Sequence, residues 1–336
     1  MQWTTGIVGG AALRAIIADS RLELVGCFAH SDAKQGVDAG VLAGGEPVGV
    51  LATSDVGTLT RLRPDCIVYM PQWPNVDEIE ELLLAGINVV TSARIVDGTH
   101  YGTDTGHRLR EAAHSGGVSL YGTGCNPMHV PTVALAATAM CRRVDRVFIE
   151  ESVDCALYAS EGNWTAYGYG STRTGEEIRD DLWRLEPDYR EAMDQVARAL
   201  GRQLDSHALH VDVALADGDR DLRFMTIAAG TVAALDARWT GLADGKPLVE
   251  LRTVWKLGSF FGHTETPSWP LRNGYRIEVT GEPNLAIDLA FDYPDPRRID
   301  VGITTAMPVV NAIPAVCAAP AGVLGPADLP LITGRA

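Results

Sequence analysis

Apolar and amphipathic stretches alternate along the first third of the chain. Four short apolar runs have the length and composition of strands: 22–28, 66–70, 87–91 and 118–121. Four stretches between them have the spacing of amphipathic helices: 10–18, 55–62, 76–85 and 104–115. Asn75 is placed to cap the third of these helices, and Gly86 to follow its end. Strands that alternate with helices in this way predict βαβ units and a parallel sheet covered on both faces.

The second half of the chain has longer runs with the character of strands. They are 144–153, 208–215, 223–239, 247–256, 273–281 and 285–292. Residues 176–200 carry apolar side chains at helical spacing, which predicts one helix packed against a core by that face. A last helix is expected over about 303–318.

Composition narrows the class of protein. The chain has 336 residues, of which 46% are hydrophobic and 21% charged, as in a globular protein of one large or two ordinary domains. Its net charge of −15 argues against non-specific binding of nucleic acid and against adsorption to an anionic membrane. No apolar run has the length of a membrane span, and the first residues do not show the basic-then-apolar pattern of a signal peptide. The six cysteines are scattered without a C-x-x-C motif, which favours reduced thiols in a cytoplasmic protein and no zinc site.

A glycine turn at the start of the chain is the first candidate site. Thr4-Thr5-Gly6-Ile7-Val8-Gly9 matches the second and third glycines of the G-x-G-x-x-G dinucleotide fingerprint, with Thr4 in place of the first. Taken alone, such a turn also suits a plain turn with a close packing contact. Before a βαβ series it predicts a dinucleotide phosphate site formed by Thr5, Gly6, Ile7, Val8 and Gly9. Only residues 1–3 are left for the first strand, so either the natural start lies upstream or the sheet edge is frayed there.

The end of the second strand bears on the choice of cofactor. An NAD site usually has Asp or Glu at this point, for the ribose hydroxyls. Here the strand ends without an acid, and His30, Ser31 and Lys34 offer hydrogen-bond donors instead. This favours NADP over NAD, with NAD as the other possibility. Alternatively, Ser31 only caps the turn that follows.

The segments after the fourth and fifth strands are expected at the same edge of the sheet. We expect Pro71, Gln72 and Thr91 to border the cofactor. Trp73 either walls the pocket or covers the sheet edge. Arg94 is a candidate to bind a phosphate or a substrate carboxylate, because it places a cation there.

Two further segments carry candidate residues. The junction at 121–131 contains two glycines and an Asn-Pro pair, and a helix is expected over 132–140. It is either a linker or a helix N-terminus at which Asn126 faces the nicotinamide. Residues 151–170 are rich in polar and aromatic side chains, which suits either a small substrate pocket or an exposed aromatic loop at a dimer contact.

Several motifs together resemble one known family. The glycine turn, the strand Asn88-Val89-Val90-Thr91 and the junction Gly122-Thr123-Gly124-Cys125-Asn126-Pro127 are similar to the dihydrodipicolinate reductase-like family. The most similar branch holds 2,4-diaminopentanoate dehydrogenase, native amine dehydrogenases and actinobacterial paralogues, and residues 310–316 and 319–322 also resemble it. Met128 stands where this family commonly has a glycine.

The resemblance implies a fold of class α/β with two domains. A Rossmann-type domain of residues 1–125, on which the helix at 303–318 packs back, would precede an α+β domain of residues 126–302. The open mixed sheet of the second domain would carry the substrate pocket and a homodimer contact.

The resemblance also implies an NAD(P)H-dependent reduction of a C=N or C=O group in a small metabolite, or the reverse. Amine dehydrogenases of this family have a glutamate at the position of Arg94. An arginine there would disfavour an iminium cation and favour a carboxylate or an oxyanion. Candidate catalytic residues are Arg94, Glu151, His129 and Tyr169. The alternatives are an amine or amino-acid dehydrogenase acting by reductive amination, and an inactive paralogue that still binds the cofactor.

Overall fold

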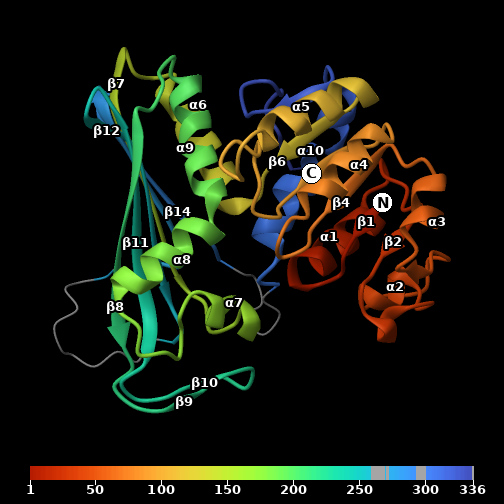
Figure 1. The fold of residues 1–336 in the computed structure, drawn as a ribbon, viewed down its shortest axis with the longest axis horizontal. Helices are drawn as coiled ribbons and strands as arrows, with labels where there is room; N and C mark the ends of the chain where they lie inside the picture. The colour runs from red at the N-terminus through yellow and green to blue at the C-terminus, as the bar shows by residue number, and fades with distance from the viewer. Residues whose placement is uncertain (259–268, 270–271, 293–299, 335–336) are drawn as a thin grey trace. The chain divides into compact units, whose positions relative to one another are not determined.

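The computed structural model describes residues 1–258, 269, 272–292 and 300–334. The chain divides into two compact units. The first is formed by Met1–His129 together with Asp300–Ala336, and the second by Val130–Ile299. Figure 1 shows the consequence for the C-terminal helix α10 (Ile303–Ala318, blue), which packs beside α1 (Ile7–Ala18, red) although most of the chain lies between them in sequence.

Seven short parallel strands form the sheet of the first unit. In spatial order they are β15 (Gly322–Leu324), β6 (Ser119–Gly122), β5 (Asn88–Thr91), β4 (Cys66–Tyr69), β1 (Gln2–Trp3), β2 (Cys27–Phe28) and β3 (Ala52–Thr53). This is the strand order of a dinucleotide-binding fold, extended by β15. The order reverses between β1 and β4, and ligands of such sheets bind outside the carboxyl ends of the strands at that point. The predicted Rossmann-type sheet is confirmed.

Helices cover both faces of this sheet. On one face, Ile79 and Leu83 of α4 (Val76–Leu84) and Leu109 of α5 (Thr105–Gly116) belong to one apolar cluster. On the other face, α1 and α10 form a second apolar cluster with Cys66 and Val68 of β4 and Val90 of β5. The shorter elements of this unit are the 3₁₀ turn η1 (Asp32–Lys34), α2 (Ala39–Leu42), α3 (Val56–Arg61) and the π-type turn η2 (Cys125–His129). Asn75 caps α4 as predicted, since its Oδ1 accepts the Glu78 N–H at 3.3 Å.

The first strand has two residues but is central to the sheet. Gln2 and Trp3 pair with β2 on one side and with β4 on the other. Trp3 is fully buried and stacks on Phe28 with 4.2 Å between ring centres. The interpretation of this strand as a frayed sheet edge is therefore wrong, because both of its sides are hydrogen-bonded.

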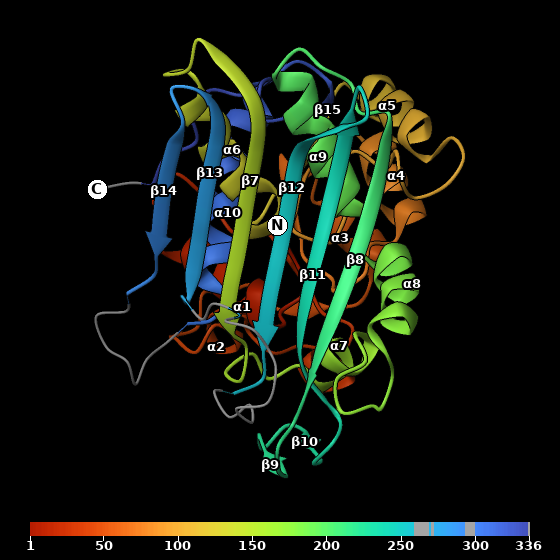
Figure 2. The same ribbon diagram turned by 90° about the vertical axis from the view of Figure 1, so that its left-hand side faces the viewer.

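The second unit contains an open mixed sheet of six strands. Their order is β14 (Leu285–Ala290), β13 (Gly274–Glu282), β7 (Arg143–Asp154), β12 (Lys246–Lys256), β11 (Val232–Ala243) and β8 (Ser206–Leu215). Figure 2 looks onto one face of this sheet, with the strands in front. The helices of this unit that pack on the strands lie behind them: α6 (Val130–Thr138), α8 (Gly175–Leu185) and α9 (Pro187–Ala199). In the described part of the chain, the face toward the viewer carries no helix of this unit. The shorter elements are α7 (Glu161–Ala166), β9 (Arg220–Asp221) and β10 (Thr226–Ile227).

Several predicted elements differ in extent from those in the structure. The helix expected over 176–200 is two helices, because Pro187 has no N–H for a helix interior and begins α9 instead. The strand expected over 223–239 is interrupted after β10 by a turn in which Gly230 has φ +75°. The run 22–28 is a strand only at Cys27–Phe28. Strands β3 and β15 were not predicted, since two or three residues are too few for a periodicity. None of the described helices is long and apolar enough to cross a bilayer.

Candidate functional site

The glycine turn leaves open space at the N-terminus of α1. Gly6 is the N-cap of this helix, with φ −73° and ψ −162°. A Cβ added at Gly6 would meet no atom within 4 Å. The first N–H groups of a helix have no partner within the helix and carry partial positive charge. A phosphate can therefore approach this backbone closely, which is the fit that a dinucleotide cofactor requires.

Gly9 and Thr4 hold the turn in shape. A Cβ at Gly9 would lie far inside van der Waals contact distance of the Thr4 carbonyl oxygen, so a glycine is required for α1 to pack this close to the end of β1. Thr4 has φ +73°, a left-handed conformation that suits the glycine of the usual fingerprint. The Gln2 side-chain amide donates to the Thr4 carbonyl oxygen at 2.8 Å. The chain thus keeps the geometry of the fingerprint although it lacks the first glycine.

The C-terminal segment supports the same turn. A Cβ at Gly302 would lie 2.8 Å from the Ile7 carbonyl oxygen, so the start of α10 packs directly on the first turn of α1. Arg14 of α1 forms an ion pair with Asp300. Sequence reasoning missed this support, because nothing in the local pattern of residues 300–302 indicates which segment they contact.

The residues after β2 bring a cation to the glycine turn. Lys34 Nζ donates to the Thr5 carbonyl oxygen at 3.0 Å and lies 2.9 Å from Thr5 Oγ1. His30 is exposed and lies edge-on to the Phe28 ring, with 4.6 Å between ring centres. Ser31 is the N-cap residue of η1 but makes no side-chain cap hydrogen bond. Of His30, Ser31 and Lys34, it is therefore Lys34 that contacts the predicted phosphate site, through Thr5.

The loops after β4 and β5 meet through Trp73 and Arg94. The guanidinium carbon of Arg94 lies 4.0 Å from the centre of the Trp73 ring, a cation–π contact. The Trp73 side chain is 39% exposed, and Pro71 and Gln72 precede it in the same loop. The Tyr101 hydroxyl donates to the Arg94 carbonyl oxygen. Arg94 is thus held at the carboxyl end of β5, as predicted from its place in the sequence.

Thr91 joins the ends of neighbouring strands. It is fully buried, its Oγ1 accepts the Ala93 N–H at 2.9 Å, and its carbonyl oxygen accepts the Thr123 N–H at 2.8 Å. Its hydroxyl oxygen therefore binds the backbone just after its own strand, and a cofactor contact by Thr91 stays a prediction.

Asn126 and His129 lie in η2, just beyond β6. Asn126 is half-buried, and the peptide bond that follows it is cis. The His129 N–H donates to the Gly124 carbonyl oxygen at 2.9 Å. Burial lowers the pKa of His129 from its ordinary value of 6.5. The imidazole is therefore neutral at neutral pH and able to accept a proton.

In the second unit, Glu151 is held by two donors on the face of the sheet that the helices cover. Its neighbours across the strands are Thr253 and Tyr275. Trp255 Nε1 donates to Glu151 Oε2 at 2.8 Å, and the Tyr275 hydroxyl donates to Oε1 at 2.5 Å. The carboxylate is therefore fixed in orientation. Sequence reasoning found Glu151 but missed both donors, which lie more than 100 residues away.

Tyr169 belongs to a buried aromatic cluster. Its side chain is 2% exposed, and its hydroxyl donates to the Trp255 carbonyl oxygen at 2.8 Å. Burial raises the pKa of Tyr169 well above its usual value, so its proton is poorly available for transfer. Trp164 packs on Tyr169 with 5.3 Å between ring centres, and Tyr167 on Trp255 with 5.6 Å. Trp164, Tyr167 and Tyr169 are buried, so these three rings do not form an exposed aromatic loop.

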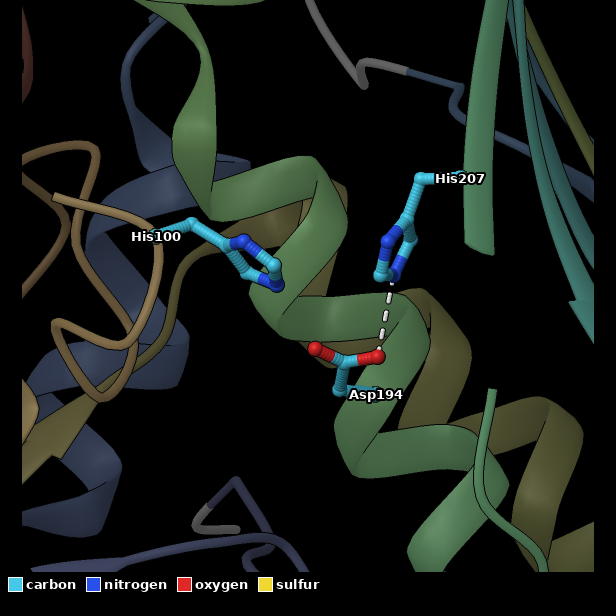
Figure 3. Close-up of side chains that lie close together, drawn as sticks. All are labelled: His100, Asp194 and His207. Atoms are coloured by element: carbon cyan, nitrogen blue, oxygen red, sulfur yellow. Dashed lines mark hydrogen bonds and ion pairs between the residues drawn. The ribbon is translucent and has the colours of Figure 1, made fainter. Parts of the chain in front are cut away.

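Two further features of this unit were not predicted. The Tyr167 hydroxyl donates to Glu186, a carboxylate that is only 4% exposed and borders a small cavity of about 10 Å³, at the lower limit of the space one water needs. His207 of β8 and Asp194 of α9 are linked by a hydrogen bond of 2.9 Å between Nε2 and Oδ1 (Figure 3). This second pair ties α9 to the edge strand of the sheet.

The fold and the glycine turn define the class: a Rossmann-type dehydrogenase with a second, sheet-forming unit. The profile of the 2,4-diaminopentanoate dehydrogenase C-terminal domain matches residues 130–335, and the chain belongs to this family. The predicted resemblance is therefore confirmed. So is the predicted class of activity, a nicotinamide-dependent oxidoreductase that acts on an amine or on the corresponding imine.

Individual relatives agree with this assignment over the whole chain. An amine dehydrogenase of Streptomyces virginiae is 26% identical over 351 residues, which cover 98% of this chain and 95% of that protein. The structure of amine dehydrogenase from Mycobacterium smegmatis is similar with a TM-score of 0.77 and 23% identity, covering 98% and 95% of the two chains. The structure of GenD2 from gentamicin A biosynthesis, in complex with NAD, has a TM-score of 0.55 and 16% identity, with 97% and 88% covered.

Proposed function

We propose that this chain is an NADP-preferring dehydrogenase of the cytoplasm that reduces the C=N bond of a small imine bearing an anionic group, or oxidises the amine in reverse. A C=O substrate of the same kind is the neighbouring possibility. The observation that carries the proposal is the open space beside Gly6 at the N-terminus of α1, into which a phosphate fits. Arg94 is the reason to expect an anionic group on the substrate. A guanidinium at the carboxyl end of β5 favours a carboxylate and disfavours a bare cationic iminium.

The preference for NADP rests on the residues after β2. No carboxylate stands at Ala29 or His30, where an NAD site usually has one for the ribose. Lys34 lies against the turn through Thr5, so a ribose phosphate bound at this strand end would meet its ammonium group. We expect Lys34→Ala to weaken NADPH binding about tenfold, or ~1.4 kcal/mol, and NADH binding much less. Lys246→Ala, at an exposed site on β12, is the matched control. Equal losses for both cofactors would contradict the preference.

The chain's own residues supply binding, orientation and a proton. When bound, the nicotinamide ring gives or takes the hydride. The N–H groups at Gly6 and Ile7 would hold phosphate, and Arg94 would orient the anionic end of the substrate. His129, neutral at neutral pH, would take up a proton in the oxidative direction. The fixed carboxylate of Glu151 is the second candidate for proton transfer, and Tyr169 is disfavoured because its hydroxyl bonds a backbone carbonyl.

Two glycines at the start of α1, the N-cap Gly6 and Gly10 in the first turns, give a sharp test of the cofactor site. Gly6→Ala adds a methyl group where only a ligand would meet it, so NADPH affinity should fall at least about tenfold while the Tm stays unchanged. In Gly10→Ala the nearest atom lies 3.7 Å from the added Cβ, so affinity should be kept and helix stability should rise by about 1 kcal/mol. Tryptophan quenching on titration with NADPH and NADH measures the affinities of both variants, and thermal unfolding measures their stabilities. The site would be refuted if neither cofactor bound at millimolar concentration, or if the two variants had equal affinity.

A second candidate function is cofactor binding without turnover. Thr4 in the glycine fingerprint and Arg94 in the position of the family's glutamate motivate it. Oxidation of NADPH with a panel of imines, ketones, and ketones with ammonia separates the two functions. Turnover on any of them supports the dehydrogenase, and binding without turnover on all of them supports the inactive paralogue.

We further expect a homodimer that pairs the uncovered faces of the second-unit sheet. That face alternates cations and anions. Arg252 bridges Glu150, at 2.6 Å, and Asp236, and Arg146 pairs with Glu250 on the same face. Alternating charges are self-complementary across a twofold axis. Arg252→Glu should shift the mass measured by light scattering to that of a monomer, whereas Arg202→Glu, at an exposed site after α9, should not.

A further inference from the structure

Two free cysteines that are distant in the sequence meet beside β4. Cys66 is the first residue of β4 and is 5% exposed, whereas Cys317 lies at the end of α10 and is exposed. Cys317 Sγ donates to the carbonyl oxygen of Asp65, the residue that precedes Cys66, at 3.8 Å. Cys66 also belongs to one apolar cluster with Ile313 and Val316, the residues of α10 that precede Cys317. Both residues lie in the first unit, so this arrangement is internal to it.

The two sulfurs have different chemical roles. The neighbouring Cys66 thiol lowers the pKa of Cys317, so the exposed sulfur is more readily a thiolate at neutral pH. The neighbouring Cys317, together with burial, raises the pKa of Cys66, which stays a thiol. A thiolate is the nucleophile in thiol–disulfide exchange, and an adjacent second thiol can resolve the mixed disulfide.

We propose that Cys66 and Cys317 form a reversible intramolecular disulfide on exposure to a small-molecule disulfide. The Cys317 thiolate attacks one sulfur of the oxidant and expels one small thiolate. Cys66 then gives up its proton and attacks Cys317 Sγ, which expels the second small thiolate. In total, two protein thiols are oxidised and one small disulfide is reduced to two thiols.

The bond would tie the end of α10 to the sheet. The opposite end of the same helix packs on the glycine turn, where Gly302 approaches the Ile7 carbonyl oxygen. Oxidation would therefore anchor the C-terminal segment that supports the proposed phosphate site. The disulfide itself depends only on the two thiols and does not rest on the proposed function.

The test uses the full-length chain and oxidised glutathione as the probe. After incubation at neutral pH, free thiols are blocked, the protein is digested without reduction, and linked peptides are identified by mass spectrometry. We expect the wild type to lose two thiols and to gain one linked Cys66–Cys317 peptide, which dithiothreitol reverses. Cys141→Ser is the matched control, because Cys141 is only half-exposed and its Sγ bonds to the Pro283 carbonyl oxygen at 3.3 Å; it should behave as the wild type.

Variants of the two thiols separate the steps. Cys66→Ser should stop at a glutathione adduct on Cys317. Cys317→Ser, at an exposed position that should not disturb folding, should lose the linked peptide altogether and keep Cys66 unmodified. If the wild type gave only a glutathione adduct on Cys317, or left both thiols unmodified while folded by circular dichroism, the proposal would be overturned.

Discussion

Thr4 sits in a conformation that its side chain opposes. Several residues other than glycine have positive φ in the described part of the chain, and Thr4 is the β-branched one among them. Its Oγ1 is buried without a hydrogen-bond partner among the described residues. Replacing Thr4 by glycine, the residue of the usual fingerprint, should therefore stabilise the first unit.

The size of this effect can be worked out from opposing contributions. Relief of the left-handed conformation contributes about 1.5 kcal/mol, and removal of an unpaired hydroxyl about 1 kcal/mol. The greater backbone freedom of glycine in the unfolded chain costs about 0.7 kcal/mol, and the lost methyl contacts about 0.8 kcal/mol. The net gain is ~1 kcal/mol, equivalent to a Tm increase of about 2–4 °C for a unit of this size.

Urea and thermal unfolding of matched variants measure the gain. Thr4→Ala removes the hydroxyl but keeps the Cβ, so it should recover less stability than Thr4→Gly. Thr5→Gly is the control, because Thr5 does not have a positive φ and its Oγ1 lies beside Lys34; it should be destabilised by about 1–2 kcal/mol. A Thr4→Gly variant less stable than the wild type, or no more stable than Thr4→Ala, would refute the reasoning.

Three further outcomes are expected. Gly9→Ala drives a methyl group into the Thr4 carbonyl oxygen, so the urea midpoint should fall by an amount equivalent to about 2–3 kcal/mol; an unchanged midpoint would show that α1 can shift away. The pKa of His129 is lowered in the folded state, so the unfolded chain takes up its proton first as the pH falls. The His129 contribution to stability is then complete above about pH 6.5 and is lost as the pH falls below it. His129→Asn should therefore make the Tm depend less on pH between pH 7 and pH 5. If His129 is also the base, the same variant abolishes the acid limb of kcat/KM for amine oxidation. Glu151→Gln should lower kcat about 100-fold or more if this carboxylate transfers the proton, with Tm changed little, whereas a loss of Tm without loss of kcat would indicate a structural role.

Much of the first unit was readable from local patterns. The helices α4, α5 and α10, and the strands β4, β5 and β6, begin and end within a few residues of the predicted ranges, because apolar periodicity and caps are properties of neighbouring residues. The break before Pro187 was also readable, since proline is a local signal, but the longer helical period obscured it.

The candidate site divides in the same way. Sequence alone indicated the glycine turn, the strand end without an acid and the cation at Arg94, because each is a short motif at a predicted strand end. Only the tertiary structure decided that Trp255 links Glu151 to Tyr169 through its indole and its backbone.

The central place of β1 is the clearest case of what local patterns leave undetermined. Residues 1–3 are too few to show a period, and their role depends on hydrogen bonds to β2 and β4, which begin tens of residues later. The meeting of Cys66 with Cys317 likewise depends on the path of the chain between them. Local side-chain patterns therefore determined which elements form. Partners, strand order and the contacts of the site were decided only when packing brought distant segments together, because those energies belong to pairs of segments rather than to either segment alone.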